Sequence, residues 1–263
     1  MRATAGDLPY FRGRFVALAH RGGVSADAPA EVENSLRAFE AAWRLGFTHL
    51  ETDVHTTADG VLIAFHDTVL DRVTDAAGAV AYLPWAEVSR ARIGGSEPVP
   101  TLDDLLDALP HARFNIDLKA PGAVEPLVAA LDRHGAHDRV CVGSFGERTI
   151  RRFRRLTAGR VPTSASPVEM AVFGLLRGVR RVFPLAGRVF QMPERHEETG
   201  LLLLSPRMVA AAHARGAQVH IWTVNDRTDM ERLIDLGVDG IVSDDLETLR
   251  GVLIDRDLWE GNA

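Results

Sequence analysis

The chain has 263 residues, of which 46% are hydrophobic and 25% charged, and its formal net charge is −6. This composition is typical of a globular protein with a sizeable core, and the acidic balance argues against a nucleic-acid-binding protein. The single cysteine, Cys141, excludes an intrachain disulfide framework and is expected to be a buried core thiol. The N-terminus has no apolar run typical of a signal peptide and no window is apolar enough to span a membrane, so the sequence predicts a cytoplasmic protein.

Short apolar runs alternate with amphipathic segments in chain order. Glycine at 46 is expected to end the first helix, and Thr101, which follows a proline, is expected to begin the second. The expected strands lie at 15–20, 48–54, 61–67, 113–119, 139–145, 160–166, 188–193, 217–225 and 239–244. The expected helices lie at 34–46, 101–109, 124–135, 147–156, 167–179, 205–216, 226–237 and 245–253.

This alternation predicts a parallel sheet with helical crossovers. No linker divides the chain, so we expect a single domain over 1–263 with its motifs between 15 and 252. A closed (β/α)8 TIM barrel is the expected architecture, with an open doubly wound sheet as the alternative. Because nine strands are expected, one of them should be a short extra strand. No G-x-G-x-x-G follows the first strand, which argues against a dinucleotide site.

Charged residues gather where the expected strands end. Catalytic groups of barrels lie at the carboxyl ends of the strands, so these residues are expected to lie close together. Two imidazoles can exchange protons near neutral pH, and the cations can bind a phosphate. The residues are His20, Arg21, Glu51, Asp53, His66, Asp67, Asp117 and Lys119, followed on later strands by Ser144, Gln191 and Trp222.

Two carboxylates, Glu51 and Asp53, point to one face of their strand because they are two positions apart. Together with Asp117 they form a set of oxygen ligands, which suits Mg²⁺ or Ca²⁺. A divalent cation bound among them would explain how two carboxylates can lie side by side. Together, metal, histidines and cations indicate phosphoryl-ester chemistry.

Each residue also has a structural alternative. His20 alone could be structural, Glu51 and Asp53 a solvated rim, and Asp117 and Lys119 an ion pair with each other; only their joint occurrence favours a site. Trp222 could pack in the core or wall a ligand. Three further histidines are expected at the surface or behind the site: His49, His55 and His196. The apolar segment 170–187 is expected to be a barrel helix and loop, or else a lip that contacts an acyl chain or a membrane surface.

At this point the sequence resembles the glycerophosphodiester phosphodiesterase family, over residues 17–249. The resemblance rests on the order and spacing of the motifs HRG (20–22), ENS (33–35), ETDVHTTADG (51–60), FHD (65–67), LDRVT (70–74), PTL (100–102), DLK (117–119) and WTVN (222–225). It implies a TIM barrel of the phospholipase-C-like type and metal-dependent hydrolysis of a glycerophosphodiester to glycerol 3-phosphate and an alcohol.

The resemblance also implies roles for individual residues. His20 and His66 would be the catalytic acid and base. Glu51, Asp53 and Asp117 would hold one divalent ion, Mg²⁺ or Ca²⁺, with Mn²⁺ a further candidate. The substrate-binding residues would be Arg21, Lys119, Glu33, Asn34 and Trp222. In the mechanism proposed for the family, the glycerol 2-hydroxyl attacks phosphorus and water then opens the cyclic phosphate.

Two features depart from the family pattern. Asp117 stands where the family has glutamate in E-x-K, which leaves the metal preference open. The segment between Asp67 and Pro100 is short, which would leave the mouth of the site more open. Lysophospholipids therefore remain alternative substrates, and a non-catalytic phosphoester-binding barrel is the alternative from another functional class. The sequence gives no oligomeric state.

Overall fold

The computed structural model describes residues 4–175, 182–196 and 199–262. Its centre is a curled sheet of parallel strands in the order β7–β6–β2–β1–β10–β9–β8. These strands are β1 (Val16–Val24), β2 (His49–Thr56), β6 (Arg113–Leu118), β7 (Val140–Gly143), β8 (Val189–Met192), β9 (Gln218–Ile221) and β10 (Gly240–Asp245).

The segment around Thr163 and Ser164 closes this sheet into a barrel. Thr163 pairs in parallel with Val142 of β7, and Ser164 pairs in parallel with Val189 of β8. The amide of Ser164 donates to the carbonyl of Val142 over 2.9 Å and the amide of Ala165 donates to the carbonyl of Val189 over 2.7 Å, so the two edges of the sheet are joined by backbone hydrogen bonds. The short segment takes the place of the eighth strand, which confirms the (β/α)8 architecture over the open doubly wound alternative.

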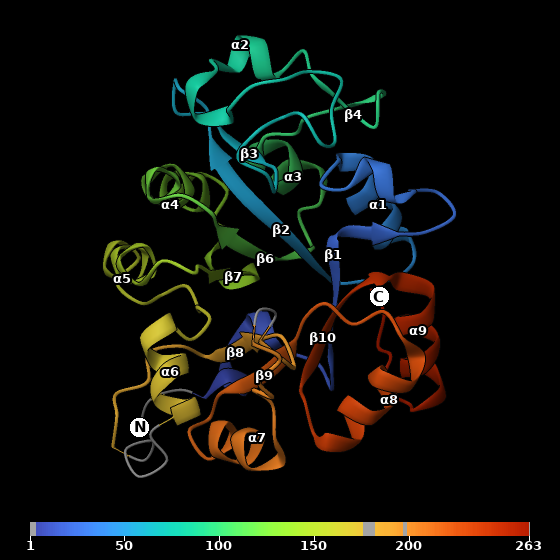
Figure 1. Ribbon diagram of the computed structural model, residues 1–263, viewed down its shortest axis with the longest axis vertical. Coiled ribbons are helices and arrows are strands. Elements are labelled where there is room, and N and C mark those ends of the chain that lie inside the picture. Colours follow the sequence, from blue (N-terminus) through green and yellow to red (C-terminus); the bar gives the residue numbers. More distant parts are fainter. Residues whose placement is uncertain (1–3, 176–181, 197–198, 263) are drawn as a thin grey trace.

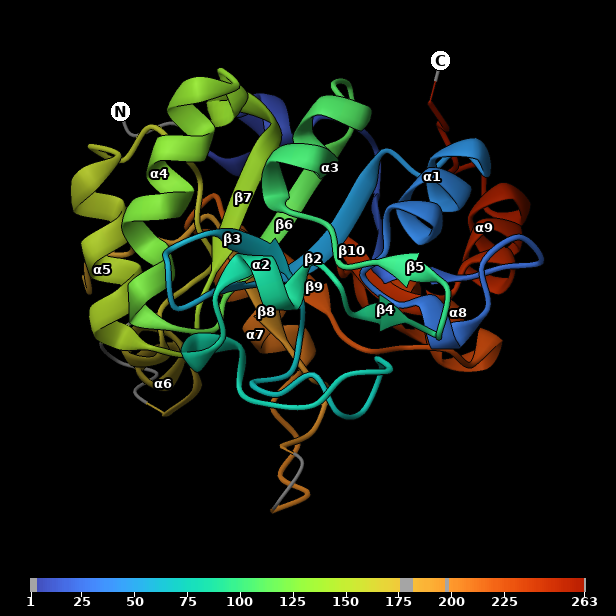
Figure 2. The same ribbon diagram turned by 90° about the horizontal axis from the view of Figure 1, so that it is seen from above.

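Helices surround the barrel (Figures 1 and 2). Ser35 caps the first, because its side chain accepts from the amide of Ala38, and this begins the helix two residues after the expected position. Thr101 begins α3 through a capping box with Asp104, as expected. The helices are α1 (Leu36–Arg44), α3 (Leu102–Ala108), α4 (Val124–Arg133), α5 (Glu147–Leu156), α6 (Pro167–Leu175), α7 (Pro206–His213), α8 (Arg227–Leu236) and α9 (Leu246–Asp255).

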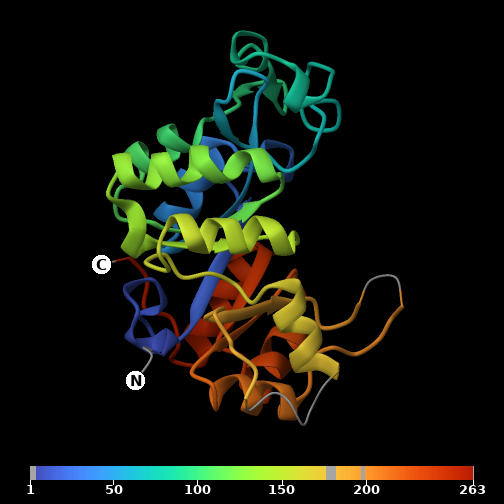
Figure 3. The same cartoon turned by 90° about the vertical axis from the view of Figure 1, so that its left-hand side faces the viewer.

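The chain between β2 and α3 forms a small insertion that stands at one end of the molecule (Figures 1 and 3). It starts with β3 (Leu62–Ala64), which pairs antiparallel with β2. The expected strand at 61–67 is therefore the extra one, and the inference that FHD ends a stave of the barrel was wrong. The insertion has its own apolar cluster of Ile63, Phe65, Leu70, Val80, Val88, Ala91, Ile93 and Val99. Its other elements are η4 (Val80–Tyr82), α2 (Trp85–Val88), β4 (Arg92–Ile93) and β5 (Glu97–Pro98).

The amino-terminal ends of the strands are covered by the start of the chain. Tyr10 and Phe11 are fully buried there and pack with Cys141 and Val189. Burial raises the pKa of the Cys141 thiol, which confirms the expected core cysteine. The remaining short helices are η1 (Ala5–Asp7), η2 (Pro9–Phe11), η3 (Ala30–Val32), η5 (Pro121–Ala123) and η6 (Ala136–Arg139). In the described part of the chain, no helix has the length and apolar character needed to cross a membrane.

Candidate active site

Strand register brings the charged residues together at the carboxyl end of the barrel. His20 on β1 lies beside Glu51 on β2, and Asp53 on β2 lies beside Asp117 on β6. Lys119 follows directly after β6. The i, i+2 spacing and the parallel register together place these side chains as the sequence predicted.

The side chain of Lys119 lies between the carboxylates of Asp53 and Asp117. Its Nζ lies 2.8 Å from Oδ1 of Asp53 and 2.8 Å from Oδ2 of Asp117. On the other side, Nε of Arg21 lies 3.3 Å from Oδ2 of Asp53. Among the described residues, no group of three or more histidine, cysteine or acidic side chains is arranged as a ready-made metal site. Asp117 and Lys119 thus do pair with each other, and Asp53 shares that pair.

Glu51 is buried beside the other acids of this cluster. Burial raises its pKa, and the negative charges of Asp53 and Asp117 raise it further. Burial also raises the pKa of Asp117, although Lys119 opposes the change. For Lys119, burial alone would lower the pKa, but the charges of Asp117 and Asp53 outweigh it and raise the pKa. The lysine therefore stays charged, whereas burial favours the neutral form of Glu51 and Asp117.

His20 is oriented by an aspartate from the other end of the chain. Its Nδ1 lies 2.6 Å from Oδ1 of Asp244, and Nδ2 of Asn225 donates to Oδ2 of the same aspartate over 3.0 Å. Burial acts to lower the pKa of His20, but the hydrogen bond to Asp244 and the charge of Glu51 outweigh it and raise the pKa. The ring's Nε2 lies 3.9 Å from Oε2 of Glu51 and thus points into the site.

His66 follows β3, the second strand of the β2–β3 hairpin, and so lies at the site. The amide of Phe65 donates to the carbonyl of Asp53 over 2.9 Å, which sets His66 beside β2. Nδ1 of His66 lies 2.6 Å from Oδ1 of Asp67, and Nε2 of His55 lies 3.0 Å from the backbone carbonyl oxygen of His66. His55 thus lies behind the site, as expected, and both catalytic candidates use Nδ1 for an aspartate.

Arg21 and Asn34 adopt left-handed backbone conformations, with φ of 53° and 58°. Such values are uncommon outside glycine and often mark functional sites. The amide of Asn34 donates to the carbonyl of Arg21 over 2.8 Å. Asn34 is buried; its Nδ2 lies 3.5 Å from Oδ2 of Asp53, and its Oδ1 accepts from the hydroxyl of Thr52 over 2.7 Å. Glu33 accepts from Nη1 of Arg21 over 3.1 Å. Both motif residues therefore hold other groups of the site in place.

The backbone of β1 passes so close to α1 that the residue after Arg21 must be glycine. Gly22 has φ of 88°, and a Cβ at this position would lie 2.6 Å from the Cβ of Ala38 in α1. The HRG motif therefore needs glycine so that β1 can turn tightly against α1 with Arg21 in its left-handed conformation.

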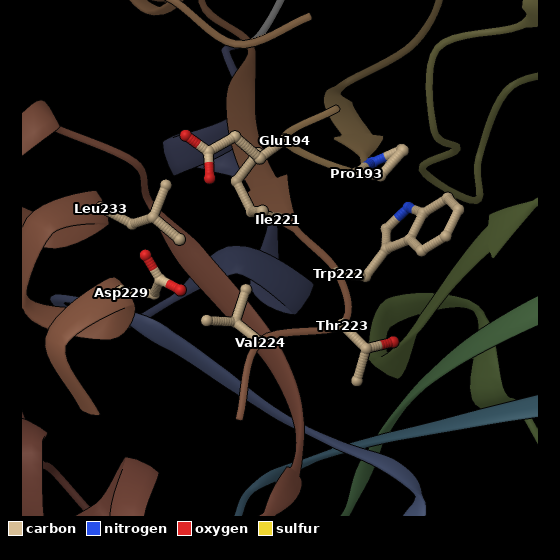
Figure 4. Close-up of a pocket in the computed structure, with 8 residues that line it drawn as sticks. All are labelled: Pro193, Glu194, Ile221, Trp222, Thr223, Val224, Asp229 and Leu233. Atoms are coloured by element: carbon tan, nitrogen blue, oxygen red, sulfur yellow. The ribbon is translucent and has the colours of Figure 1, made fainter. Parts of the chain in front are cut away.

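Two aromatic rings lie beside the charged cluster. Phe145, which is 72% exposed, meets half-buried Trp222 edge-on, with ring centroids 6.1 Å apart. Nζ of Lys119 lies 5.8 Å from the centroid of the Phe145 ring. A cavity of about 370 Å³ is lined by Trp222 together with Asp229 and Leu233 (Figure 4). Trp222 is the only one of the expected site residues that lines this cavity.

Sequence reasoning missed four contributors. Asp244 ends the last expected strand, 239–244, where the rule used for the other strands would have found it, and Asn225 closes the quoted WTVN motif. Phe145 ends the expected strand at 139–145, where the same rule would have found it, whereas Arg72, in the quoted LDRVT motif, had no periodic or spacing signal. The expectation for His49 was wrong, because this residue is buried at the opposite end of the barrel.

The segment 170–187 is only partly described. In α6, Phe173 is buried against Phe190, with ring centroids 4.6 Å apart, as expected for a barrel helix. Residues 176–181 lie outside the described residues. Contact of this segment with an acyl chain or a membrane surface therefore stays a prediction.

Comparisons with known proteins agree on one family. The sequence model described as "Glycerophosphoryl diester phosphodiesterase family" matches residues 20–248. The chain is 42% identical to "Probable glycerophosphodiester phosphodiesterase 2" of Mycobacterium tuberculosis, over 94% of this chain and 93% of that protein. It is 25% identical to human "Lysophospholipase D GDPD1", over 90% of this chain and 85% of that protein.

Solved structures give the same picture of the fold. A putative glycerophosphoryl diester phosphodiesterase from Silicibacter pomeroyi superimposes with a TM-score of 0.80 at 25% identity, covering 98% of this chain and 100% of that one. A phosphodiesterase from Oleispira antarctica, solved in complex with its product sn-glycerol-3-phosphate, superimposes with a TM-score of 0.74 at 21% identity, covering 90% and 96% of the two chains.

Proposed function

The chain belongs to the glycerophosphoryl diester phosphodiesterase family, and on that premise we propose that it hydrolyses glycerophosphodiesters with His20 and His66 as proton donor and acceptor. The observation that carries this proposal is the pair of histidines, each held at Nδ1 by an aspartate 2.6 Å away. A barrel that only bound a phosphoester would need the cations but not two oriented imidazoles.

The residues that bind the substrate are the cations of the cluster. Arg21 and Lys119 are both held against Asp53, so they are fixed in position before the substrate arrives. A phosphodiester carries a negative charge, which these cations would neutralise and orient.

The proposed reaction has two steps. One imidazole takes the proton of the glycerol 2-hydroxyl while its oxygen bonds to phosphorus; the bond to the alcohol breaks, and the other imidazole protonates the leaving oxygen. In the second step the imidazoles exchange roles, because water must lose a proton to open the cyclic phosphate and the 2-oxygen must regain one. Glycerol 3-phosphate and the free alcohol are the products.

The carboxylates fit a divalent cation by donor type and by electrostatics. Glu51, Asp53 and Asp117 offer hard oxygen donors, and because burial raises the pKa of Glu51 and of Asp117, a cation among them would stabilise their anionic forms. These three residues would hold Mg²⁺ or Ca²⁺, or Mn²⁺, which would supply charge neutralisation to the phosphate. Lys119 competes for the same oxygens of Asp53 and Asp117.

The test is release of glycerol 3-phosphate and alcohol from a panel of esters. The protein is treated with EDTA and then assayed with Mg²⁺, Mn²⁺ or Ca²⁺ restored. The panel holds glycerophosphocholine, glycerophosphoethanolamine, glycerophosphoglycerol, glycerophosphoinositol and lysophosphatidylcholine. We expect metal-dependent turnover of the soluble diesters and, for His20→Asn or His66→Asn, a fall in kcat of at least about 100-fold.

Three results would change the proposal. Full activity in EDTA would contradict the metal assignment, and full activity of both histidine variants would contradict the mechanism. Turnover of the lysophospholipid alone would favour the second candidate, a lysophospholipase D. That candidate has one structural observation in its favour, the exposed Phe145 ring beside Trp222, which could meet an apolar chain.

A further inference from the structure

Arg72 joins two carboxylates at the edge of the site. Its Nε and Nη2 donate to the two oxygens of Asp67 over 2.5 and 3.1 Å. Its Nη1 and Nη2 donate to the two oxygens of Glu33 over 3.1 and 2.6 Å. One planar guanidinium thus makes a paired hydrogen bond with each acid, a geometry that lysine cannot reproduce.

Each of these carboxylates also holds a group of the active site. Asp67 bonds Nδ1 of His66, and Glu33 accepts from Nη1 of Arg21 over 3.1 Å. Arg72 therefore touches neither catalytic histidine nor phosphate-binding cation, yet it is one side chain away from both. The Arg21 guanidinium comes from β1 and the His66 ring from the insertion, and Arg72 connects the two through their carboxylate partners.

We propose that Arg72 is a positioning residue that sets His66 and Arg21 relative to each other for the reaction of the bound phosphodiester. This inference rests on the proposed function. It also gives the insertion a role beyond shaping the mouth, because Arg72 and Asp67 both belong to the insertion, whereas Glu33 lies between β1 and α1.

Two observations separate this role from a purely structural one. The Arg72 side chain is 48% exposed, and ion pairs of such exposure contribute little to folding stability. Arg72 and Glu33 also line a cavity of about 590 Å³, so removal of the guanidinium leaves space beside the carboxylates that water can enter. We therefore expect loss of Arg72 to affect turnover more than stability.

The experiment measures kcat and KM for glycerophosphocholine, together with Tm, in wild type, Arg72→Met, Arg72→Lys and Arg90→Met. Arg90 is an exposed arginine of the same insertion that takes no part in these ion pairs, so Arg90→Met serves as the control. We expect Arg72→Met to lower kcat by about 10- to 100-fold at nearly unchanged Tm, as for other residues that orient a catalytic group through one contact. Arg72→Lys should recover only part of the loss.

A double-mutant cycle with Asp67→Asn tests whether Arg72 acts through Asp67. If it does, Arg72→Met should lower kcat by a smaller factor in the Asp67→Asn background than in wild type. An equal factor in both backgrounds, or a wild-type kcat in Arg72→Met, would overturn the inference. In both of those cases the proposed function would stand, because wild type and Arg90→Met would still hydrolyse the ester. If they turn over none of the soluble diesters, the proposed function fails, and this inference falls with it.

Discussion

The rings of His20 and His66 are each held by an aspartate, although the two aspartates come from different parts of the chain. An aspartate oxygen lies 2.6 Å from Nδ1 of each ring, so in the proposed mechanism both rings would present Nε2 to the substrate. Burial alone would raise the pKa of Asp67, but hydrogen bonds and charge from Arg72 and His66 lower it to about 2. For Asp244, burial likewise acts to raise the pKa, and the hydrogen bond with His20 lowers it overall. Both aspartates are therefore negative at neutral pH and can stabilise an imidazolium.

Asp244→Asn should lower kcat by about 10- to 100-fold while Tm changes little. The amide no longer offers a negative charge to the protonated His20 ring and no longer selects its tautomer. The measurement is steady-state hydrolysis of a soluble diester alongside thermal unfolding.

Asp103→Asn is the matched control for this variant. Asp103 lies 2.7 Å from Nε2 of His134 and is 45% exposed, close to the 40% exposure of Asp244, but it belongs to α3 on the outside of the barrel. A kcat that falls equally in both variants, or in neither, would contradict the assigned role of Asp244.

The residues at the strand ends could be predicted because strand direction and spacing place them. Their partners could not, because they come from remote or irregular parts of the chain. Asp244 is 224 positions from His20, and only the closed barrel brings β10 beside β1. Arg72 lies in an insertion without helical or strand periodicity, so nothing local indicates which acids it will meet. The sequence also could not tell that Lys119 would bridge Asp53 as well as Asp117.

At the scale of elements, the short stave at Thr163 and Ser164 depends on one side chain of α5. Arg154 donates from Nε to the hydroxyl of Thr163 and from Nη2 to the carbonyl of Ser164, each over 2.8 Å. The same Nη2 lies 2.8 Å from Oε2 of Glu169 in α6, which is buried. Arg154 therefore fastens α5, the stave and α6 together where the barrel closes.

Arg154→Met should lower the free energy of unfolding by about 3–5 kcal/mol, because it leaves the Glu169 carboxylate buried without its cation. Arg151→Met, in the same helix, should change it by less than about 0.5 kcal/mol, because Arg151 pairs with Glu147 at the surface. Urea unfolding of the two variants measures the difference. Similar losses in both would mean that Arg154 does not fasten the closing stave.

The element that the sequence analysis misplaced is β3, and the sequence did contain a warning. Only the five residues 57–61, with Asp59 and Gly60 among them, separate β2 from β3, which is a hairpin signal. A parallel crossover needs a dozen or more residues, so a strand this close along the chain had to run antiparallel. Apolar runs alone predict strands but not their direction, and connection length supplies the missing information.

At the scale of the molecule, the two ends of the barrel have opposite character. The carboxyl end holds the charged cluster, whereas the amino end is closed by Tyr10 and Phe11 over two buried histidines, His49 and His220. The alternation of strands and helices predicted the barrel, but no pattern indicated that residues 9–11 would seal it. Nε2 of His49 lies 2.8 Å from the carbonyl of Tyr10, so this histidine fastens the seal.

This closed end should make the protein sensitive to acid. Burial lowers the pKa of His49 to about 4, and burial together with the charge of His49 lowers the pKa of His220 to about 3. In the unfolded chain both titrate near 6.5. Between these pKa values the unfolded state therefore binds more protons than the folded state. The free energy of unfolding consequently falls as pH drops from about 6.5 to about 4, by about 3 kcal/mol for His49 alone.

The check is denaturant unfolding at pH 7, 5.5 and 4.5 for wild type, His49→Gln and His111→Gln. A glutamine cannot take up the proton, so His49→Gln should lose less stability between pH 7 and 4.5 than wild type does, even if it is less stable at pH 7. His111 is exposed, so its variant should follow wild type across the range. If all three lost the same amount, acid sensitivity would have to come from the carboxylates, and the seal at the amino end would not depend on a neutral histidine.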